Sequence, residues 1–163
     1  MPTLRIAIFV PNLEEIAPQR SMVALANGLH LRGLSVDVVA PMGGGPLRAA
    51  LAPGIGQIDL AKRHTRTSVL ALARILAERR PVGLLSPGGD AGLVALGAAI
   101  LARRGTPVAV VGDVDEGKDG WGRRALSRLL RPRAAVMIDG RDGAESASVQ
   151  CLAAFGLGRG DGA

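Results

Sequence analysis

Aromatic residues are almost absent from this 163-residue sequence. Phe9, Trp121 and Phe155 are the three that occur, and there is no tyrosine. Proteins that bind single-stranded nucleic acid stack its bases on aromatic side chains, so we expect no nucleic acid partner. Hydrophobic residues still make up 48% of the sequence. The core must therefore be built from Ala, Val, Leu and Ile, a mixture that suits close packing of helices on a sheet.

Cysteine and long apolar runs are also scarce. Cys151 is the only cysteine, which excludes an internal disulfide and fits the reducing cytoplasm. The apolar run at residues 4–10 is too short for a signal peptide and is followed by Pro11, so we predict a strand there. The longest apolar stretch, around residues 91–102, falls short of the roughly 20 residues of a spanning helix. These features predict a cytoplasmic protein that can lie peripherally on the inner face of the membrane.

Lysine is rare too, with two residues, so arginine supplies nearly all of the formal charge of +6. This balance permits an acidic partner such as phosphate or anionic lipid. Arg124, Arg128 and Arg131 share one face of a predicted helix at i, i+4 and i+7 spacing. This face is either solvated or positioned against an anionic membrane surface, with the arginines reaching the headgroups.

Strand-like apolar runs alternate with helical patterns along the chain. The runs lie at residues 5–10, 36–40, 57–60, 82–86, 108–112 and 134–138, and the helical patterns at 18–32, 68–80, 91–104, 121–130 and 143–155, with a short turn at 46–51. The alternation predicts an α/β fold, a doubly wound, mostly parallel six-stranded Rossmann-like sheet with helices on both faces, in the order 3-2-1-4-5-6. We expect one domain at residues 1–157 and a flexible tail at 158–163.

In such a sheet, ligands bind outside the carboxyl ends of the strands, where the strand order reverses between strands one and four. This rule selects the loop at residues 11–15, the loop at residues 87–90 and, as their neighbour, the acidic loop that begins at Asp113. Neither GxGxxG after strand one nor GxxxxGK[ST] anywhere is present, which argues against a dinucleotide site in the usual place and against a P-loop.

Two glycine-containing loops each allow two interpretations. The glycines at 43–45 form either a flexible loop or a backbone that approaches a ligand phosphate. Gly88 and Gly89 precede a helix whose free N–H groups can bind an anion. Asp90, however, is placed to cap those same donors with its own carboxylate.

No metal site is predicted. The acidic run at residues 113–119 fails the EF-hand spacing, because a glycine and a lysine stand where an oxygen ligand and the glycine belong. The two histidines, His30 and His64, are far apart in the sequence.

Three segments, RIAIFVPNL at residues 5–13, QRSMVALANGL at 19–29 and RGLSVDVV at 32–39, resemble the opening of the family 4-like glycosyltransferases. Those enzymes begin with a strand that ends in Pro or Asn, a Gly-rich loop with Ala-Glu-Arg, a helix that reads roughly LA-x-x-L-x-x-RGH-x-V, and a second strand. GPLR at 45–48, RRPV at 79–82 and TPV at 106–108 are similar in place and kind.

The resemblance implies one half of a GT-B architecture, in which two Rossmann-like domains face each other across a cleft. The N-terminal domain holds the acceptor, often a lipid-linked or polysaccharide sugar, and the C-terminal domain holds the nucleotide-sugar donor. This chain is then the N-terminal, acceptor-side domain, with no cofactor of its own and with the donor bound by an absent C-terminal domain. The acceptor-binding residues that the resemblance implies are Asn12, Glu14, Glu15, Gln19, Arg20, Gly88 and Gly89.

The sequence also departs from the family pattern. The Gly-rich loop is replaced by residues 14–17, and Ala-Glu-Arg by Pro18-Gln19-Arg20. The histidine that many relatives carry after strand four is absent, which leaves Asp90 and Asp113 as the candidate catalytic residues. We therefore expect hexosyl transfer only together with a partner, either a second GT-B half or another copy. The alternatives are a non-catalytic domain that docks on a protein partner or an anionic membrane, and a nucleotide-dependent enzyme of another Rossmann type.

Overall fold

The structure is a computed structural model that describes residues 3–103, 105–111, 134–138 and 143–157. Its strands are β1 (Arg5–Phe9), β2 (Ser35–Ala40), β3 (Gly56–Asp59), β4 (Gly83–Pro87), β5 (Val108–Val111) and β6 (Ala134–Ile138). Its helices are α1 (Ala17–Leu31), α2 (Val69–Arg79), α3 (Asp90–Ala102) and α5 (Gly143–Ala154), with 3-10 turns η1 (Pro46–Ala50) and η2 (Thr65–Ser68). The predicted helix at 121–130, the residues Asp113, Arg124, Arg128 and Arg131, and the tail at 158–163 lie outside the described residues.

The strands form one parallel sheet in the order β3-β2-β1-β4-β5-β6. The first five pair in regular register, whereas β6 joins β5 with a register shift at Val108/Ala109. The order reverses at β1, which lies between β2 and β4. The predicted α/β fold class is confirmed, because one parallel sheet packs against a hydrophobic core on each face. The edge strand β3 departs from the buried pattern, with Gln57 and Asp59 exposed.

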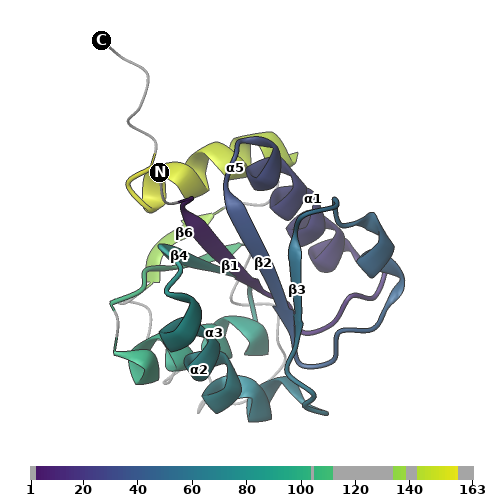
Figure 1. The fold of residues 1–163 in the computed structure, drawn as a ribbon, viewed down its shortest axis with the longest axis vertical. Helices are drawn as coiled ribbons and strands as arrows, with labels where there is room; N and C mark the ends of the chain where they lie inside the picture. The colour runs from purple at the N-terminus through teal and green to yellow at the C-terminus, as the bar shows by residue number, and fades with distance from the viewer. Residues whose placement is uncertain (1–2, 104, 112–133, 139–142, 158–163) are drawn as a thin grey trace.

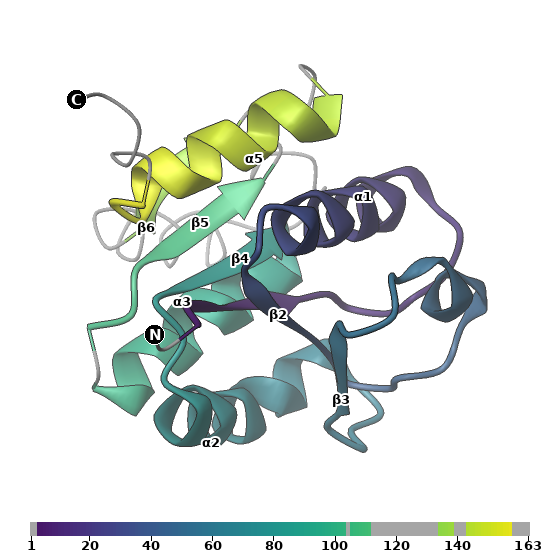
Figure 2. The same ribbon diagram turned by 45° about the horizontal axis from the view of Figure 1, so that its top comes forward.

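Helices cover both faces of the sheet, with α1 and α5 on one face and α2 and α3 on the other (Figure 1, Figure 2). Successive residues of a strand point to opposite faces. Ile6 and Ile8 of β1 therefore belong to the core under α1 and α5, while Ala7 and Phe9 belong to the core under α2 and α3. Each core consists mainly of aliphatic side chains, as the scarcity of aromatic residues predicts.

The residues at the two ends of α1 are the helix start and stop residues expected from the sequence. Pro18 lies in the first turn, where its missing N–H leaves no hydrogen bond unmade. Gly33 follows the helix with a φ of 86°, a conformation that favours glycine. Because α1 begins directly after the loop that follows β1, these signals fix where its first turn meets the carboxyl edge of the sheet.

An ion pair with a buried carboxylate connects the strands at the amino edge of the sheet, opposite the carboxyl edge. Asp37 of β2 is 4% exposed, and its Oδ2 lies 2.6 Å from Nη1 of Arg5 on β1. Nη1 of Arg79, at the end of α2, is 3.9 Å from the same oxygen. A Cβ at Gly56 of β3 would meet the other carboxylate oxygen of Asp37. The carboxylate is thus enclosed between three strands and paired on its open side.

We expect Arg5→Ala to lower the free energy of unfolding by about 2 kcal/mol, because removal of one partner leaves a buried charge incompletely paired. Urea denaturation followed by circular dichroism measures this change. The matched control is Arg74→Ala, whose exposed i,i+4 pair with Glu78 should contribute about 0.5 kcal/mol or less. Equal effects of the two substitutions would contradict the assigned role of the buried pair.

Candidate functional site

Two amides meet in the segment that joins β1 to α1. Asn12 follows β1, and Gln19 lies in the first turn of α1. The Gln19 Nε2 group donates to Oδ1 of Asn12 at 3.1 Å, and the backbone N–H of Glu14 donates to the same oxygen at 3.2 Å. The sequence placed both amides in the candidate site, and the structure joins them in one hydrogen-bonded unit.

Gln19 is buried, with 3% of its surface exposed, although it belongs to a residue type that usually faces water. Its Oε1 atom is closed off from solvent and has no hydrogen-bond partner in the part of the chain that the structure describes. A buried acceptor without a partner destabilises a fold by about 1–3 kcal/mol. Such groups are uncommon in folded proteins, and each calls for an explanation.

Arg20 and Glu15 lie at the rim of the same segment. Nη2 of Arg20 is 3.0 Å from Oε1 of Glu15, and both side chains are about 60% exposed. Glu14 and Ile16 are exposed as well. Five predicted residues, Asn12, Glu14, Glu15, Gln19 and Arg20, therefore share one short segment, in which a partly buried amide pair lies next to an exposed charged rim.

Gly45 packs against the start of this segment. It has a φ of 141°, and an added Cβ would lie 2.5 Å from the carbonyl oxygen of Leu13. That oxygen also accepts a 3.0 Å hydrogen bond from the backbone N–H of Leu47. By contrast, a Cβ at Gly44 would meet nothing within 4 Å. At Gly45, then, close backbone packing requires the glycine, and neither interpretation of the 43–45 loop offered from the sequence included this contact.

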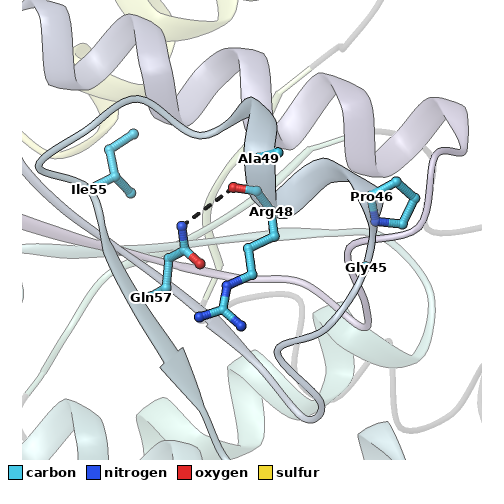
Figure 3. Close-up of a pocket in the computed structure, with 6 residues that line it drawn as sticks. All are labelled: Gly45, Pro46, Arg48, Ala49, Ile55 and Gln57. Atoms are coloured by element: carbon cyan, nitrogen blue, oxygen red, sulfur yellow. Dashed lines mark hydrogen bonds between the residues drawn. The ribbon is translucent and has the colours of Figure 1, made fainter.

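An open hollow of about 630 Å³ lies on the other side of Gly45, between η1 and the start of β3 (Figure 3). Gly45, Pro46, Arg48, Ala49, Ile55 and Gln57 line it. The Gln57 amide donates to the Arg48 carbonyl oxygen at 3.5 Å. The hollow holds no described cluster of buried polar groups, so we do not count it as part of the candidate site.

The second predicted segment follows β4, the strand next to β1. Gly89, with a φ of 75°, occupies the N-cap position of α3, and no side chain caps the helix. The prediction that Asp90 caps α3 is wrong. Asp90 is already the first residue of the helix, and its Oδ2 lies 3.5 Å from Nε of Arg66 in η2.

Arg66 is a residue that the sequence analysis missed. It stands in the basic stretch between β3 and α2, and the carboxyl end of β3 lies at the same edge as those of β1 and β4. The sequence could therefore have indicated Arg66, because the rule that selected the loops after strands one and four also applies to the loop after strand three. Of the two candidate catalytic carboxylates, Asp90 lies at this edge beside Arg66, and Asp113 is outside the described residues.

Comparison with solved structures identifies the fold. MurG of Acinetobacter baumannii superposes with a TM-score of 0.60 at 14% identity, over 83% of this chain and 41% of MurG. UDP-N-acetylglucosamine 2-epimerase of Rickettsia bellii gives 0.56 at 16% identity, over 96% of this chain and 43% of the epimerase. The Rossmann-like α/β fold of this chain matches these GT-B neighbours. At these identities the likeness concerns the fold alone.

This GT-B-like domain spans less than half the length of MurG and of the epimerase. AnUbiX (PadA1), solved in complex with FMN and dimethylallyl pyrophosphate, is different: its TM-score is 0.58 at 11% identity, over 99% of this chain and 100% of AnUbiX. No protein-family model and no curated protein matches the sequence.

The described residues also show what the chain offers a membrane or a metal ion. No helix in the described part of the chain is long and apolar enough to cross a membrane. Among the same residues, no three His, Cys, Asp or Glu side chains come together as metal ligands.

Proposed function

We propose that this chain is the acceptor-side domain of a family 4-like GT-B glycosyltransferase and acts together with a donor-binding domain. The fold supports the proposal, as does the resemblance carried by residues 5–39. In this reaction an acceptor hydroxyl attacks the anomeric carbon of a nucleotide sugar, and the nucleotide leaves. The task of this domain is to hold that hydroxyl in line with the donor, which the second domain binds.

The observation that carries the proposal is the partly buried pair of amides, Asn12 and Gln19, at the carboxyl edge of the sheet. Gln19 stands where the family pattern has the glutamate of Ala-Glu-Arg, and Asn12 holds it at 3.1 Å. Neutral amides that present hydrogen-bonding groups suit an uncharged, hydroxyl-rich ligand. Arg20 and Glu15 at the rim would contact outer parts of the acceptor. Gly89, the N-cap residue of α3, lies at the same edge, whereas the N–H of Gly88 already donates to the Val111 carbonyl oxygen at 3.2 Å.

Arg20→Ala should raise the acceptor KM of the reconstituted enzyme about ten- to hundredfold, since a charged hydrogen bond contributes about 1.5–3 kcal/mol. Stability should change little, because the Arg20–Glu15 pair is exposed. The measurement is steady-state kinetics of the chain together with its donor-binding partner, with Glu15→Ala as a second variant and Arg74→Ala as control. An unchanged acceptor KM for both variants would remove the rim from the site.

The alternative function is a non-catalytic domain that docks on a protein partner or an anionic membrane. It is favoured by the departure from the family pattern after β4, where residues 86–90 contain no histidine. Flotation with phosphatidylglycerol vesicles tests the membrane branch. Salt-sensitive binding that is lost when Arg124, Arg128 and Arg131 are changed to glutamine would support it, and absence of binding would remove it.

A further inference from the structure

The orientation of the Gln19 amide is fixed by its neighbours. Asn12 receives a hydrogen bond from the backbone N–H of Glu14, so the receiving atom of Asn12 must be its oxygen. An oxygen accepts hydrogen bonds only, so Gln19 must present its NH₂ group there, as it does at 3.1 Å. The Gln19 oxygen is then forced to the other side. A flipped Gln19 would place two amide oxygens against each other.

This leaves Oε1 of Gln19 as an acceptor that faces no donor within the described part of the chain. We propose that a neutral hydrogen-bond donor of the bound ligand, a hydroxyl group of a sugar or polyol, completes this bond, and that phosphate and carboxylate groups are rejected at this position. The inference rests on the proposed function and specifies its ligand. An uncharged hydroxyl group donates a hydrogen bond to Oε1 of Gln19. An anionic oxygen fails there because two acceptors would face each other without a proton between them.

Binding requires local movement, because Oε1 is closed off from solvent. Residues 13–16 join Asn12 to α1, and three of them, Glu14, Glu15 and Ile16, are exposed. Leu13, in contrast, is buried, and its carbonyl oxygen is held by Leu47. Movement of this exposed part of the segment, with Leu13 in place, would open Oε1 of Gln19 to a ligand.

The test uses the whole chain, labelled with ¹⁵N and titrated at neutral pH with methyl α-D-glucoside or with acetate. We expect the glucoside to produce saturable shifts of the Gln19 side-chain amide and of the backbone amides of Glu14 to Ile16. Acetate, which carries no hydrogen-bond donor, should leave the Gln19 signal in place. Gln19→Met, which keeps the length of the side chain but removes its acceptor, should weaken glucoside binding about tenfold, equivalent to about 1.4 kcal/mol. Gln57→Met, on exposed β3, should change nothing.

Denaturation separates loss of the ligand contact from loss of the fold. Gln19→Met should unfold at about the same urea concentration as the parent chain or a higher one, since removal of a buried acceptor without a partner offsets loss of the hydrogen bond from Nε2 to Asn12. Asn12→Ala removes the same hydrogen bond and is the reference. A midpoint lower than that of Asn12→Ala would show that Oε1 is already satisfied in the free protein, for example by a buried water, and would overturn the inference. So would glucoside binding of equal affinity in Gln19→Met, or no saturable shift near Gln19.

Failure of this inference can be told from failure of the proposed function. If the reconstituted enzyme transfers sugar and Gln19→Met leaves its acceptor KM unchanged, the function stands and the inference falls. If no transfer is found but the glucoside titration behaves as expected, the ligand inference stands on its own and the catalytic function falls.

Discussion

Gly45→Ala should lower the free energy of unfolding by about 2–4 kcal/mol, because it combines backbone strain with a steric clash. A φ of 141° is strained for any residue with a side chain. The added Cβ would also lie 2.5 Å from the carbonyl oxygen of Leu13 and 2.7 Å from its carbonyl carbon. These are backbone atoms, so no rotamer change relieves the clash. Urea denaturation measures the loss.

The effect should reach the candidate site, because Leu13 directly follows Asn12. Separation of η1 from Leu13 would break the hydrogen bond from Leu47 and free the segment that carries the amide pair. Gly44→Ala is the matched control: an added Cβ there meets nothing within 4 Å, and the expected change is within about 0.5 kcal/mol. Equal stability of the two variants would mean that the packing of Gly45 on Leu13 does not hold the segment.

Cys151 should be protected from alkylation in the folded protein by about a thousandfold or more. Its side chain is fully buried in the core under α1 and α5, and burial raises the pKa of the thiol to about 12. Reaction needs an accessible thiolate, which only unfolding supplies, and an unfolding free energy of at least about 5 kcal/mol makes that state rare. Iodoacetamide labelling followed by mass spectrometry, with and without urea, measures the ratio. Comparable rates in both conditions would contradict the assigned burial.

The same thiol predicts how stability depends on alkaline pH. The unfolded chain releases the proton near the ordinary pKa of 9.0, and the folded chain near 12. The unfolded state therefore loses the proton first, so stability is full below pH 9 and declines between 9 and 12. There is no tyrosine and there are only two lysines, so few other groups titrate there. Cys151→Ala should flatten this decline, and an unchanged slope would contradict the prediction.

The sheet order was predictable because most strands are apolar runs and helical patterns separate them. The edge strand β3 is the exception, since Gln57 and Asp59 flank Ile58 there. The helix predicted at 68–80 is confirmed as α2 at Val69–Arg79, and the 3-10 turn η2 before it was not predicted. The prediction that failed is the cap at Asp90, which is the first residue of α3 and lies beside Arg66. Arg66 is a tertiary neighbour that the local sequence around Asp90 does not show.

The candidate site was predictable as a location but not as a geometry. The rule for parallel sheets and the family resemblance both selected the segment after β1, and the structure places Asn12 and Gln19 in contact there. Nothing in the sequence shows that Oε1 of Gln19 lacks a partner or that Gly45 touches Leu13. The contact of Gly45 depends on tertiary packing between residues that are 32 positions apart in the sequence. The free acceptor of Gln19 depends on the orientation of one buried amide.

The most direct test of the central claim is affinity purification of the tagged chain from its native cells, with mass spectrometry of the proteins that accompany it. The account predicts a stoichiometric partner, or a longer form of the same chain, that carries a second Rossmann-type domain, and transfer of sugar from a nucleotide sugar by the joined pair. A chain that is recovered alone at its present length, or a pair that transfers no sugar, would contradict the claim that this domain is the acceptor half of a glycosyltransferase.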